Sequence, residues 1–253
     1  MRSHFIISPG NERIAPVVEH VAEVFASRQG TLLHQGRNEI RRIAVGTGSP
    51  VVIKRYKRAN IVQRIVYTLF RPSKCRRAYE YAARFRQLGI GTPRELAYAE
   101  LACCGLFRDG YFFCEECRWE SAKTALPDEG SYDAQLADAV AALVVELHKK
   151  GVLHGDLNLS NILFVKNADG YQFMLIDTNR SLFLEHEPSR EQCICNLMRI
   201  THRRDLFERI FRTYGRLRGW SPETTYLSGL DVLERFEHRK HLINTVKKKL
   251  KLK

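Results

Sequence analysis

The segment VLHGDLNLSNILF, residues 152–164, most constrains the fold of this chain, because it places a polar loop between two apolar runs. It holds one carboxylate, two carboxamides and a histidine within eight positions. Residues 132–150 before it form the clearest helical pattern in the chain, and Gly151 suits the C-terminal cap of that helix. Residues 162–177 after it form a strand, a turn and a second strand. The sequence therefore predicts a loop fixed between buried elements.

The polar side chains of this loop match the needs of phosphoryl transfer. Asp156 precedes Asn161 by five positions, and Asp177 follows at the end of the apolar run FMLID. In such a reaction a carboxylate positions the attacking hydroxyl, and Mg²⁺ binds carboxylate and carboxamide oxygens. Asp and Asn are also the commonest turn residues, so the spacing alone leaves a surface turn open. The pattern, which starts at His154, resembles the H-x-D-x-x-x-x-N loop and metal-binding Asp of the protein-kinase superfamily.

The order of elements around the loop supports a two-lobed protein-kinase-like fold of the α+β class. Residues 31–57 are expected to form β-hairpins, and VVIK ends one of these strands at Lys54, as the phosphate-binding lysine of a kinase should. The first part of the chain is mostly β, and the rest is mostly helical. We expect one domain with a β-rich N-lobe (about 1–117), an inter-lobe linker (118–130) and a compact, mostly helical C-lobe (131–253).

Several other elements of the N-lobe can be assigned from periodicity and turn chemistry. Helices are expected over residues 14–27, 60–70 and 74–88, because apolar residues recur there with a helical period. Residues 95–117 are expected to form a strand, a turn and a second strand, with Arg108–Gly110 (RDG) as the turn.

When more of the chain is considered, the resemblance becomes specific to one family. The segments SKCRRAYEYAARFRQLGIGTPRELAY, LHGDLNLSNILF, FMLIDTNRSLF and RTYGRLRGW resemble the bacterial lipopolysaccharide kinase family, over roughly residues 30–220. That family includes kinases of 3-deoxy-D-manno-octulosonic acid (Kdo) and of core heptoses. The resemblance implies an enzyme that uses ATP and Mg²⁺ to phosphorylate an inner-core sugar of lipopolysaccharide at the cytoplasmic face of the inner membrane.

The resemblance also implies roles for single residues. Asp156 would orient and deprotonate the sugar hydroxyl, and His154 would brace the loop, although a buried histidine with a purely structural role remains an alternative. Asn161 and Asp177 would hold Mg²⁺. Lys54 would pair with the α- and β-phosphates. The backbone from Glu115 to Cys117 would meet the adenine where the lobes join.

Two parts of the kinase pattern are weak in this chain. Only Gly36 stands where protein kinases have a glycine-rich phosphate loop, so backbone amides and an arginine would have to hold the phosphates. Glu80 is the only acidic residue of its helix and thus the only candidate there to pair with Lys54. It lies well away from the apolar stripe, and pairing with a basic residue one turn away is an equal alternative.

Charge is concentrated in one part of the chain. Residues 37–94 hold fifteen Lys or Arg and only two acidic residues, within a chain of net charge +13. Such asymmetry suggests a polyanionic partner. Within this segment, residues 57–74 combine a broad apolar helix face with flanking cations, which would suit an anionic membrane surface; packing against the N-lobe is an equal alternative.

The composition also bears on the expected cellular location and on the alternative functions. No apolar run is long enough for a bilayer span, and the N-terminal run is too short for a secretory signal, so we expect a cytoplasmic protein peripheral to the inner membrane. Rival enzymes are a small-molecule phosphotransferase of the aminoglycoside or choline type and an atypical protein kinase. A membrane- or glycan-binding pseudokinase is less favoured, because Lys54 and the three polar residues are all present. No nucleic-acid partner is expected, because aromatic residues do not alternate with the basic ones.

Overall fold

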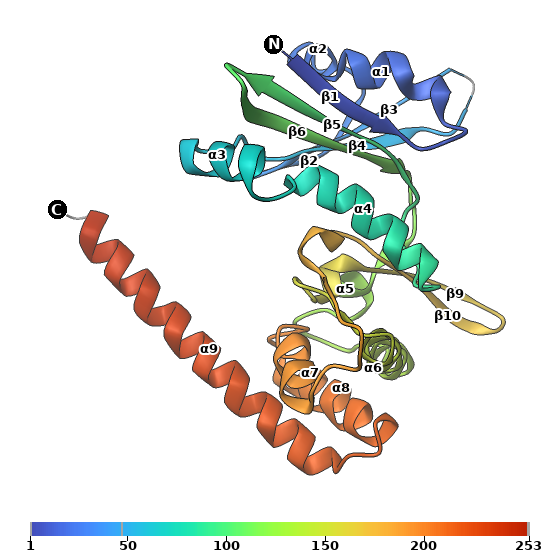
Figure 1. Ribbon diagram of the computed structural model, residues 1–253. Helices are drawn as coiled ribbons and strands as arrows, with labels where there is room; N and C mark the ends of the chain where they lie inside the picture. The colour runs from blue at the N-terminus through green and yellow to red at the C-terminus, as the bar shows by residue number, and fades with distance from the viewer. Residues whose placement is uncertain (1, 47, 252–253) are drawn as a thin grey trace. The chain divides into compact units, whose positions relative to one another are not determined.

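The chain divides into two compact units in the computed structural model, which describes residues 2–46 and 48–251 (Figure 1). Unit 1 comprises Met1–Arg118 and a short later segment, Met174–Arg180. Unit 2 comprises Trp119–Phe173 and Ser181–Lys253. The chain thus returns to unit 1 for seven residues that include Asp177, one of the expected site residues.

Unit 1 is built on a six-stranded sheet with the order β1-β5-β6-β4-β3-β2, in which neighbouring strands are antiparallel. The strands are β1 (Arg2–Ile7), β2 (Thr31–Gln35), β3 (Glu39–Ile43), β4 (Val51–Arg55), β5 (Glu95–Cys103) and β6 (Leu106–Glu115). The short helix η1 (Glu12–Ile14) and the helices α1 (Ala15–Glu19) and α2 (Val21–Ala26) lie on one face of the sheet, and α4 (Lys74–Gln87) lies on the other (Figure 1). A further helix, α3 (Ile61–Leu69), precedes α4.

Side chains alternate along β4, so that one set faces the hydrophobic core and the other set faces the candidate site. Val51 and Ile53 are fully buried in the cluster formed with α1 and α2. Residues of the opposite parity point to the other face. Tyr56, which shares the parity of Lys54, accordingly packs against Cys75 and Ala78 of α4. The strand therefore presents Lys54 on the α4 face while the core holds its backbone in place.

Unit 2 contains the remaining elements. Its strands are β7 (Glu120–Ser121), β8 (Val152–Leu153), β9 (Ile162–Asn167), β11 (Leu182–Phe183) and all but the last two residues of β10 (Gly170–Leu175). Its helices are α5 (Ala122–Ala125), α6 (Ala134–Lys149), α7 (Arg190–Leu197), α8 (Arg204–Leu217), α9 (Pro222–Lys251) and the short 3₁₀ helix η2 (Leu159–Asn161). Another 3₁₀ helix, η3 (Thr178–Arg180), belongs to unit 1, as η1 does.

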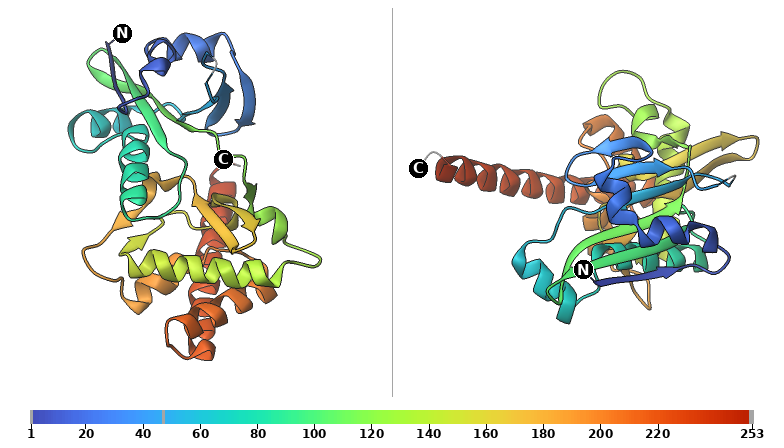
Figure 2. Two further views of the ribbon diagram at one scale, coloured as in Figure 1. Left: turned by 90° about the vertical axis from the view of Figure 1, so that its right-hand side faces the viewer. Right: turned by 90° about the horizontal axis from the view of Figure 1, so that it is seen from above.

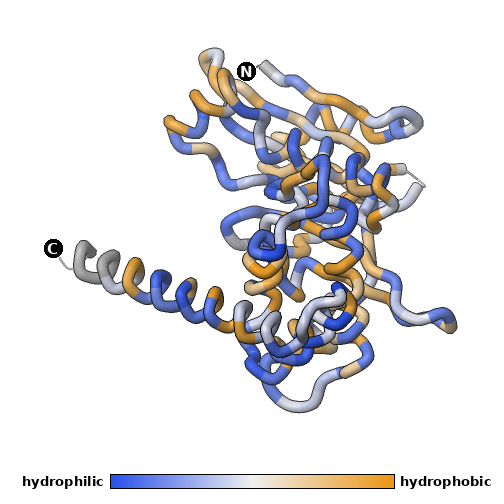
Figure 3. The backbone as a smooth tube through the Cα atoms, turned by 60° about the horizontal axis from the view of Figure 1, so that its bottom comes forward, coloured by the Kyte–Doolittle hydropathy of each residue, from blue (hydrophilic) through white to orange (hydrophobic). Residues whose placement is uncertain are grey.

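The core of unit 2 lies between its helices. Leu136 and Val144 of α6 are fully buried, as are Phe207 and Phe211 of α8, whose rings stack at 4.2 Å. The first part of α9 contacts α7 and α8, and the helix then continues beyond them (Figure 2). Its last part is mainly hydrophilic with short hydrophobic interruptions (Figure 3). Within the described residues, no helix combines the length and the apolar character needed to cross a bilayer.

Most of the expected elements are confirmed, among them helices within residues 60–70, 74–88 and 132–150. The expected turn at Arg108–Gly110 is wrong, because these residues lie inside β6. The turn instead falls at Cys104 and Gly105, whose φ angles of 54° and 76° form the left-handed pair that a two-residue hairpin prefers. Gly110 fits in the strand because Cys75 of α4 approaches it so closely that a Cβ would lie 2.7 Å from the Cys75 sulfur.

Three further differences concern the N-terminus and the expected linker. Residues 2–7 form β1, paired with β5, which the sequence did not indicate because the run has no turn signal that points to its partner. The expected helix over 14–27 is split into η1, α1 and α2, with an interruption at His20. The segment 118–130, expected as a linker, contains β7 and α5, and Ala122 and Leu126 within it are fully buried in unit 2.

Candidate active site

In unit 1, the structure brings Lys54 and Asp177 together. The ammonium nitrogen of Lys54 lies 2.8 Å from Oδ1 of Asp177, although the two residues are 123 positions apart in sequence. Both side chains are partly buried, so their attraction is screened less than that of a surface pair. This contact joins the end of β4 to the short segment that returns from unit 2.

The backbone around Asp177 is held in an uncommon conformation. Its φ of +59° lies in the left-handed region, which aspartate tolerates better than most residues. Two hydrogen bonds of 2.8 Å anchor the preceding strand end: Leu175 N–H donates to Gly91 O, and the Thr92 hydroxyl donates to Leu175 O. The side-chain amide of Asn179 also donates to the Asp177 carboxylate. The carboxylate is therefore fixed by its neighbours before any ligand binds.

Cations surround this carboxylate in unit 1. The pKa of Lys74 is lowered because its charge is partly buried and because Arg37, Arg180 and Arg77 lie nearby. Arg77 is buried, and among the described residues its Nε has no hydrogen-bond partner. A buried, unsatisfied guanidinium nitrogen is costly unless an acceptor reaches it. Phosphate oxygens are suitable acceptors, so the residues beside Asp177 fit a nucleotide triphosphate.

In unit 2, the loop between β8 and β9 holds the other expected residues in a hydrogen-bonded network. His154 is fully buried, and its Nδ1 accepts a hydrogen bond of 3.2 Å from the Asp156 N–H. The amides of Asn158 and Asn161 both donate to the Asp156 carbonyl, at 2.9 and 2.8 Å. Asn158 also caps η2 by accepting from the Ser160 N–H. These bonds give His154 and Asn158 loop-positioning roles and leave the Asp156 side chain partly exposed.

A second network supports this loop from behind. The Asn196 amide donates to the carbonyl of His154 at 2.8 Å, and Oδ1 of Asn196 lies 3.1 Å from Nε2 of His148. Nδ1 of His148 lies 2.7 Å from the Tyr214 hydroxyl. Since Oδ1 can only accept, His148 must carry its proton on Nε2 and accept from tyrosine at Nδ1. Burial lowers the pKa of His148 to about 4, which keeps it neutral in this arrangement.

Two features of this site were not found from the sequence. The His148–Asn196 support joins residues 48 positions apart, and nothing in their spacing signals the contact. The guanidinium of Arg199 lies 3.3 Å from Oδ1 of Asp156, directly beside the expected base. Arg199 follows α7 in a segment that the sequence marks only as helical and basic. Both contacts depend on how α7 packs in unit 2.

The expected partner of Lys54 on α4 is wrong. Glu80 contacts Arg76 one turn earlier, with 2.7 Å between Nε and Oε1, whereas Lys54 contacts Asp177. The α4 face near the site carries Arg77 in place of an acidic residue.

The residues expected at the nucleotide base and phosphates are placed in unit 1. Gly36 lies in the turn between β2 and β3, next to the end of β4, where the Lys57 N–H donates to the Asn38 side chain. The N–H of Glu115 already donates to Arg94 O at 2.9 Å, so that donor is not available to an adenine. Cys117 follows β6 and is half-buried.

The described residues offer no complete metal site made of protein side chains. Across residues 2–46 and 48–251, no three or more His, Cys, Asp or Glu side chains gather in a group that could hold a metal ion. Mg²⁺ commonly binds one or two protein oxygens and takes its other ligands from phosphates and water. Asp177 in unit 1 and Asn161 in unit 2 each provide an oxygen of the type that Mg²⁺ prefers, so each residue taken by itself fits a role as an Mg²⁺ ligand.

The β-rich unit 1 with its strand-end lysine, and the helical unit 2 with its Asp–Asn loop, define a protein-kinase-like fold. The model of the lipopolysaccharide kinase (Kdo/WaaP) family matches residues 35–209, and the chain belongs to this family.

Individual relatives agree with this assignment. A 3-deoxy-D-manno-octulosonic acid kinase from Pasteurella multocida (strain Pm70) is 27% identical over 139 residues, which cover 53% of this chain and 58% of that protein's length. The solved structure of WaaP in complex with acyl carrier protein matches with a TM-score of 0.57 at 18% identity, over 94% of this chain and 98% of that chain. The latter shows a shared fold.

Proposed function

We propose that this protein transfers the γ-phosphoryl group of ATP, with Mg²⁺, to a hydroxyl of an inner-core lipopolysaccharide sugar, Kdo or heptose. The observation that carries the proposal is the pairing of Lys54 with Asp177 in unit 1, together with the ordered Asp156–Asn161 loop in unit 2. Family membership supports the class of acceptor, and the relative named as a Kdo kinase favours Kdo.

Each polar residue has a separate part in this reaction. The Asp156 carboxylate accepts the proton of the sugar hydroxyl as that oxygen attacks the γ-phosphorus, and the bond to the bridging oxygen of ADP breaks. Lys54 binds phosphate oxygens, and Arg77 and Lys74 add positive charge on the same side of unit 1. Asp177 and Asn161 would hold Mg²⁺, which would supply neutralisation of the phosphate charge. His154 and Asn158 keep the loop in shape.

The strong positive charge favours an anionic acceptor over an aminoglycoside. The chain carries a net charge of +13. A cationic acceptor would be repelled by this field, whereas an anionic glycan would be attracted and concentrated near the protein. A hydroxyl on a protein without a strong negative charge would not be attracted by this positive charge.

A transfer assay with four acceptors tests the proposal. Labelled ATP is offered with Kdo–lipid A, a heptosylated core, an aminoglycoside or a generic protein, and wild type is compared with Asp156→Ala. We expect label on a glycolipid and a loss of at least about 100-fold in kcat for Asp156→Ala, since removal of a general base typically costs 10²–10⁴-fold. Label on protein or aminoglycoside alone would refute the proposed acceptor, and undiminished activity of the variant would refute the proposed base.

Support for a location at the cytoplasmic face of the inner membrane comes from α3. On the side that faces the sheet, Arg64 donates to the carbonyls of Phe107 and Cys103, and the Thr68 hydroxyl accepts from the Phe107 N–H. The Tyr67 ring also packs edge-on against the Phe107 ring there. The opposite side is apolar and exposed, with Leu69 and Phe70 at 66% and 79% exposure. This is the reverse of the usual amphipathic helix, which buries its apolar side.

The charges around α3 fit an anionic lipid surface. Lys57, Arg58 and Arg71 are exposed at its two ends, and no acidic residue occurs from residue 57 to residue 74. An apolar helix face flanked by cations is the arrangement that interfacial helices use on anionic membranes. The lipid-linked acceptor would then be met at the surface where α3 binds.

A further inference from the structure

Arg199 lies between the proposed base and the last helix of unit 2. It follows α7 directly after the Met198 cap, and its Nη2 lies 3.3 Å from Oδ1 of Asp156. The centre of its guanidinium group lies 5.5 Å from the ring centroid of Phe236 in α9, so the group also stacks on an aromatic surface. The side chain is 44% exposed. An exposed guanidinium therefore borders the carboxylate that would receive the substrate proton.

The geometry of the Arg199–Asp156 contact argues against a purely structural ion pair. Arginines that fix a carboxylate usually do so with two parallel hydrogen bonds of about 2.7–2.9 Å. Arg203 and Asp205 nearby make such a pair, at 2.7 and 2.8 Å. Arg199 offers a single contact of 3.3 Å to Asp156. Most of the donor capacity of this guanidinium is thus left for another anionic group.

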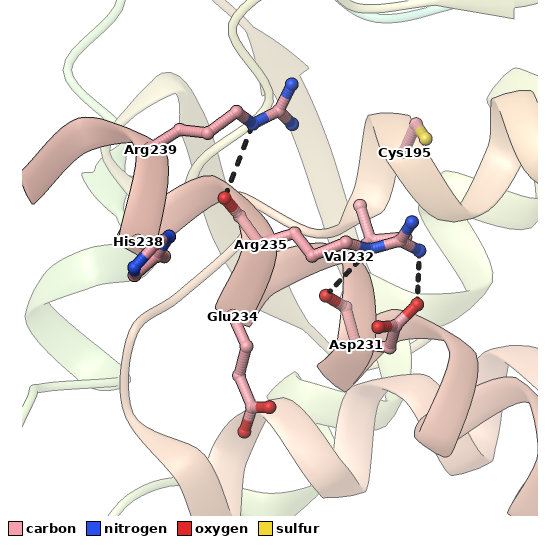
Figure 4. Close-up of a pocket in the computed structure, with 7 residues that line it drawn as sticks. All are labelled: Cys195, Asp231, Val232, Glu234, Arg235, His238 and Arg239. Carbon is pink, nitrogen blue, oxygen red and sulfur yellow. Dashed lines mark hydrogen bonds and ion pairs between the residues drawn. The ribbon is translucent and has the colours of Figure 1, made fainter. Parts of the chain in front are cut away.

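A groove lies along α9 in unit 2 (Figure 4). It has a volume of about 650 Å³ and is lined by Arg235, His238 and Arg239 among others. Cys195, one helical turn before Arg199, lines it as well, and Arg235 adjoins Phe236, on which Arg199 stacks. Asp231 and Glu234 also line the groove, and Arg235 pairs with Asp231, so the feature that suits an acidic saccharide is the guanidinium of Arg199 itself.

We propose that Arg199 binds the carboxylate of an acidic sugar acceptor and so positions a neighbouring hydroxyl against Asp156. This rests on the proposed function, because it assigns a specificity-determining residue to that reaction. Planar guanidinium groups recognise carboxylates through a matched pair of N–H donors, and stacking on Phe236 holds the plane of Arg199 in place. An acceptor without the carboxylate would lose this contact but would still reach Asp156.

The test combines a residue change with an acceptor change. Acceptors are Kdo–lipid A and the same glycolipid with its Kdo carboxylates converted to methyl esters; proteins are wild type, Arg199→Ala and Arg199→Lys. The control is Arg204→Ala, which removes another half-exposed arginine that contacts α9, at Glu237. Thermal melting confirms that each variant is folded.

We expect Arg199→Ala to raise the KM for Kdo–lipid A about 10- to 100-fold, as for loss of a charged hydrogen-bond partner, with the KM for ATP unchanged. The methyl ester should raise the wild-type KM by a similar factor and should not raise that of Arg199→Ala further. The KM of Arg199→Lys for Kdo–lipid A should lie between those of wild type and Arg199→Ala, and the KM of Arg204→Ala should equal that of wild type.

Three results would overturn the inference. The first is an unchanged KM for Kdo–lipid A in Arg199→Ala, and the second is an equal KM of wild type for the acid and the methyl ester. The third is a KM of Arg199→Ala for the methyl ester that is raised by the product of the two single effects. Binding of Kdo–lipid A in detergent without ATP gives a readout independent of turnover, and it should weaken in parallel with the rise in KM. If wild type phosphorylates neither Kdo–lipid A nor a heptosylated core, the proposed function fails and this inference fails with it, whereas phosphorylation of the heptosylated core alone refutes only the inference. If wild type phosphorylates Kdo–lipid A and Arg199→Ala does so equally well, the inference alone fails.

Discussion

Lys54 and Asp177 form an ion pair of 2.8 Å within unit 1, although the chain passes through Trp119–Phe173 of unit 2 between them. The pair ties the end of β4 to a segment of seven residues that is also anchored by the Leu175 N–H bond to Gly91 O and by the Thr92 hydroxyl bond to Leu175 O. A lysine and a carboxylate in contact also define where phosphates and their metal ion can be bound. Under the proposed function, this one contact would have both a structural and a chemical role.

Replacement of Lys54 by methionine should lower kcat/KM for ATP by about 100-fold, the usual order for loss of one preorganised donor to a reacting phosphate or oxyanion. The unfolding free energy should fall by about 1 kcal/mol or less, because both partners are partly solvated. Lys57→Met provides the control, since Lys57 is an exposed lysine of the same basic run. Initial rates against ATP concentration, with urea denaturation, measure both effects. Equal losses in the two variants would show that Lys54 acts only through general charge.

His148 should make the protein sensitive to mild acid. Its pKa is about 4 in the folded protein because of burial, against about 6.5 when unfolded, so the unfolded state binds more protons between these values. Neutral His148 makes its full contribution to the free energy of unfolding above about pH 6.5. This contribution, up to about 3 kcal/mol, is lost as the pH falls toward 4.

Urea denaturation of wild type and His148→Gln at pH 7.5 and pH 5 measures this dependence. The variant should be less stable at pH 7.5 and should lose less stability on acidification. His202→Gln is the matched control, because His202 is exposed and contacts Glu237 on the surface of unit 2. A pH dependence that is the same in wild type and His148→Gln would assign the acid sensitivity to other groups.

The parts of the site that sequence could predict are those set by short-range pattern. The loop from His154 to Asn161 was predicted because its hydrogen bonds run between residues two to five positions apart. Lys54 was predicted because alternation along one strand and a following turn fix where a strand-end residue points.

Long-range side-chain choices could not be predicted in the same way. Glu80 had two candidate partners, Lys54 and a basic residue one turn away, and the structure has Arg76. The choice depends on which long-range contact Lys54 makes, and its partner Asp177 lies 123 positions away in sequence. Arg199 reaches Asp156 only through the packing of α7, for which the sequence has no spacing signal.

Gly229 of α9 should not tolerate a methyl group. A Cβ at this position would lie 2.1 Å from a ring carbon of Phe211 in α8, and Phe211 is fully buried. Gly229→Ala should therefore lower the unfolding free energy by about 1–3 kcal/mol, despite the better helix propensity of alanine. Ser228→Ala, the preceding residue, should be close to neutral. Calorimetric melting of both variants measures the difference, and a melting temperature for Gly229→Ala at or above wild type would contradict the packing of α8 on α9.

The exposed face of α3 should control attachment to anionic vesicles. Leu69→Gln with Phe70→Gln removes apolar side chains worth about 1.5–3 kcal/mol each when buried in lipid, and Lys57→Glu with Arg71→Glu reverses charges worth about 1 kcal/mol each. Either pair should reduce co-sedimentation with phosphatidylglycerol vesicles at least tenfold, and only the charge pair should lose its effect in high salt. Arg64 is left intact, because it holds α3 on β5 and β6 through the carbonyls of Cys103 and Phe107.

Leu227→Gln is the control for the apolar change, because Leu227 is 52% exposed on α9 and lies outside the basic segment. It should leave vesicle binding unchanged. Vesicle binding that survives both pairs of changes in α3 would refute the docking role of this helix. In that case the outward apolar face would have to serve another partner, although its inward polar contacts with β6 would stand. Phosphorylation of detergent-solubilised acceptor should be unaffected by all these changes, since none of them lies in the Lys54–Asp177 pair or in the Asp156 loop.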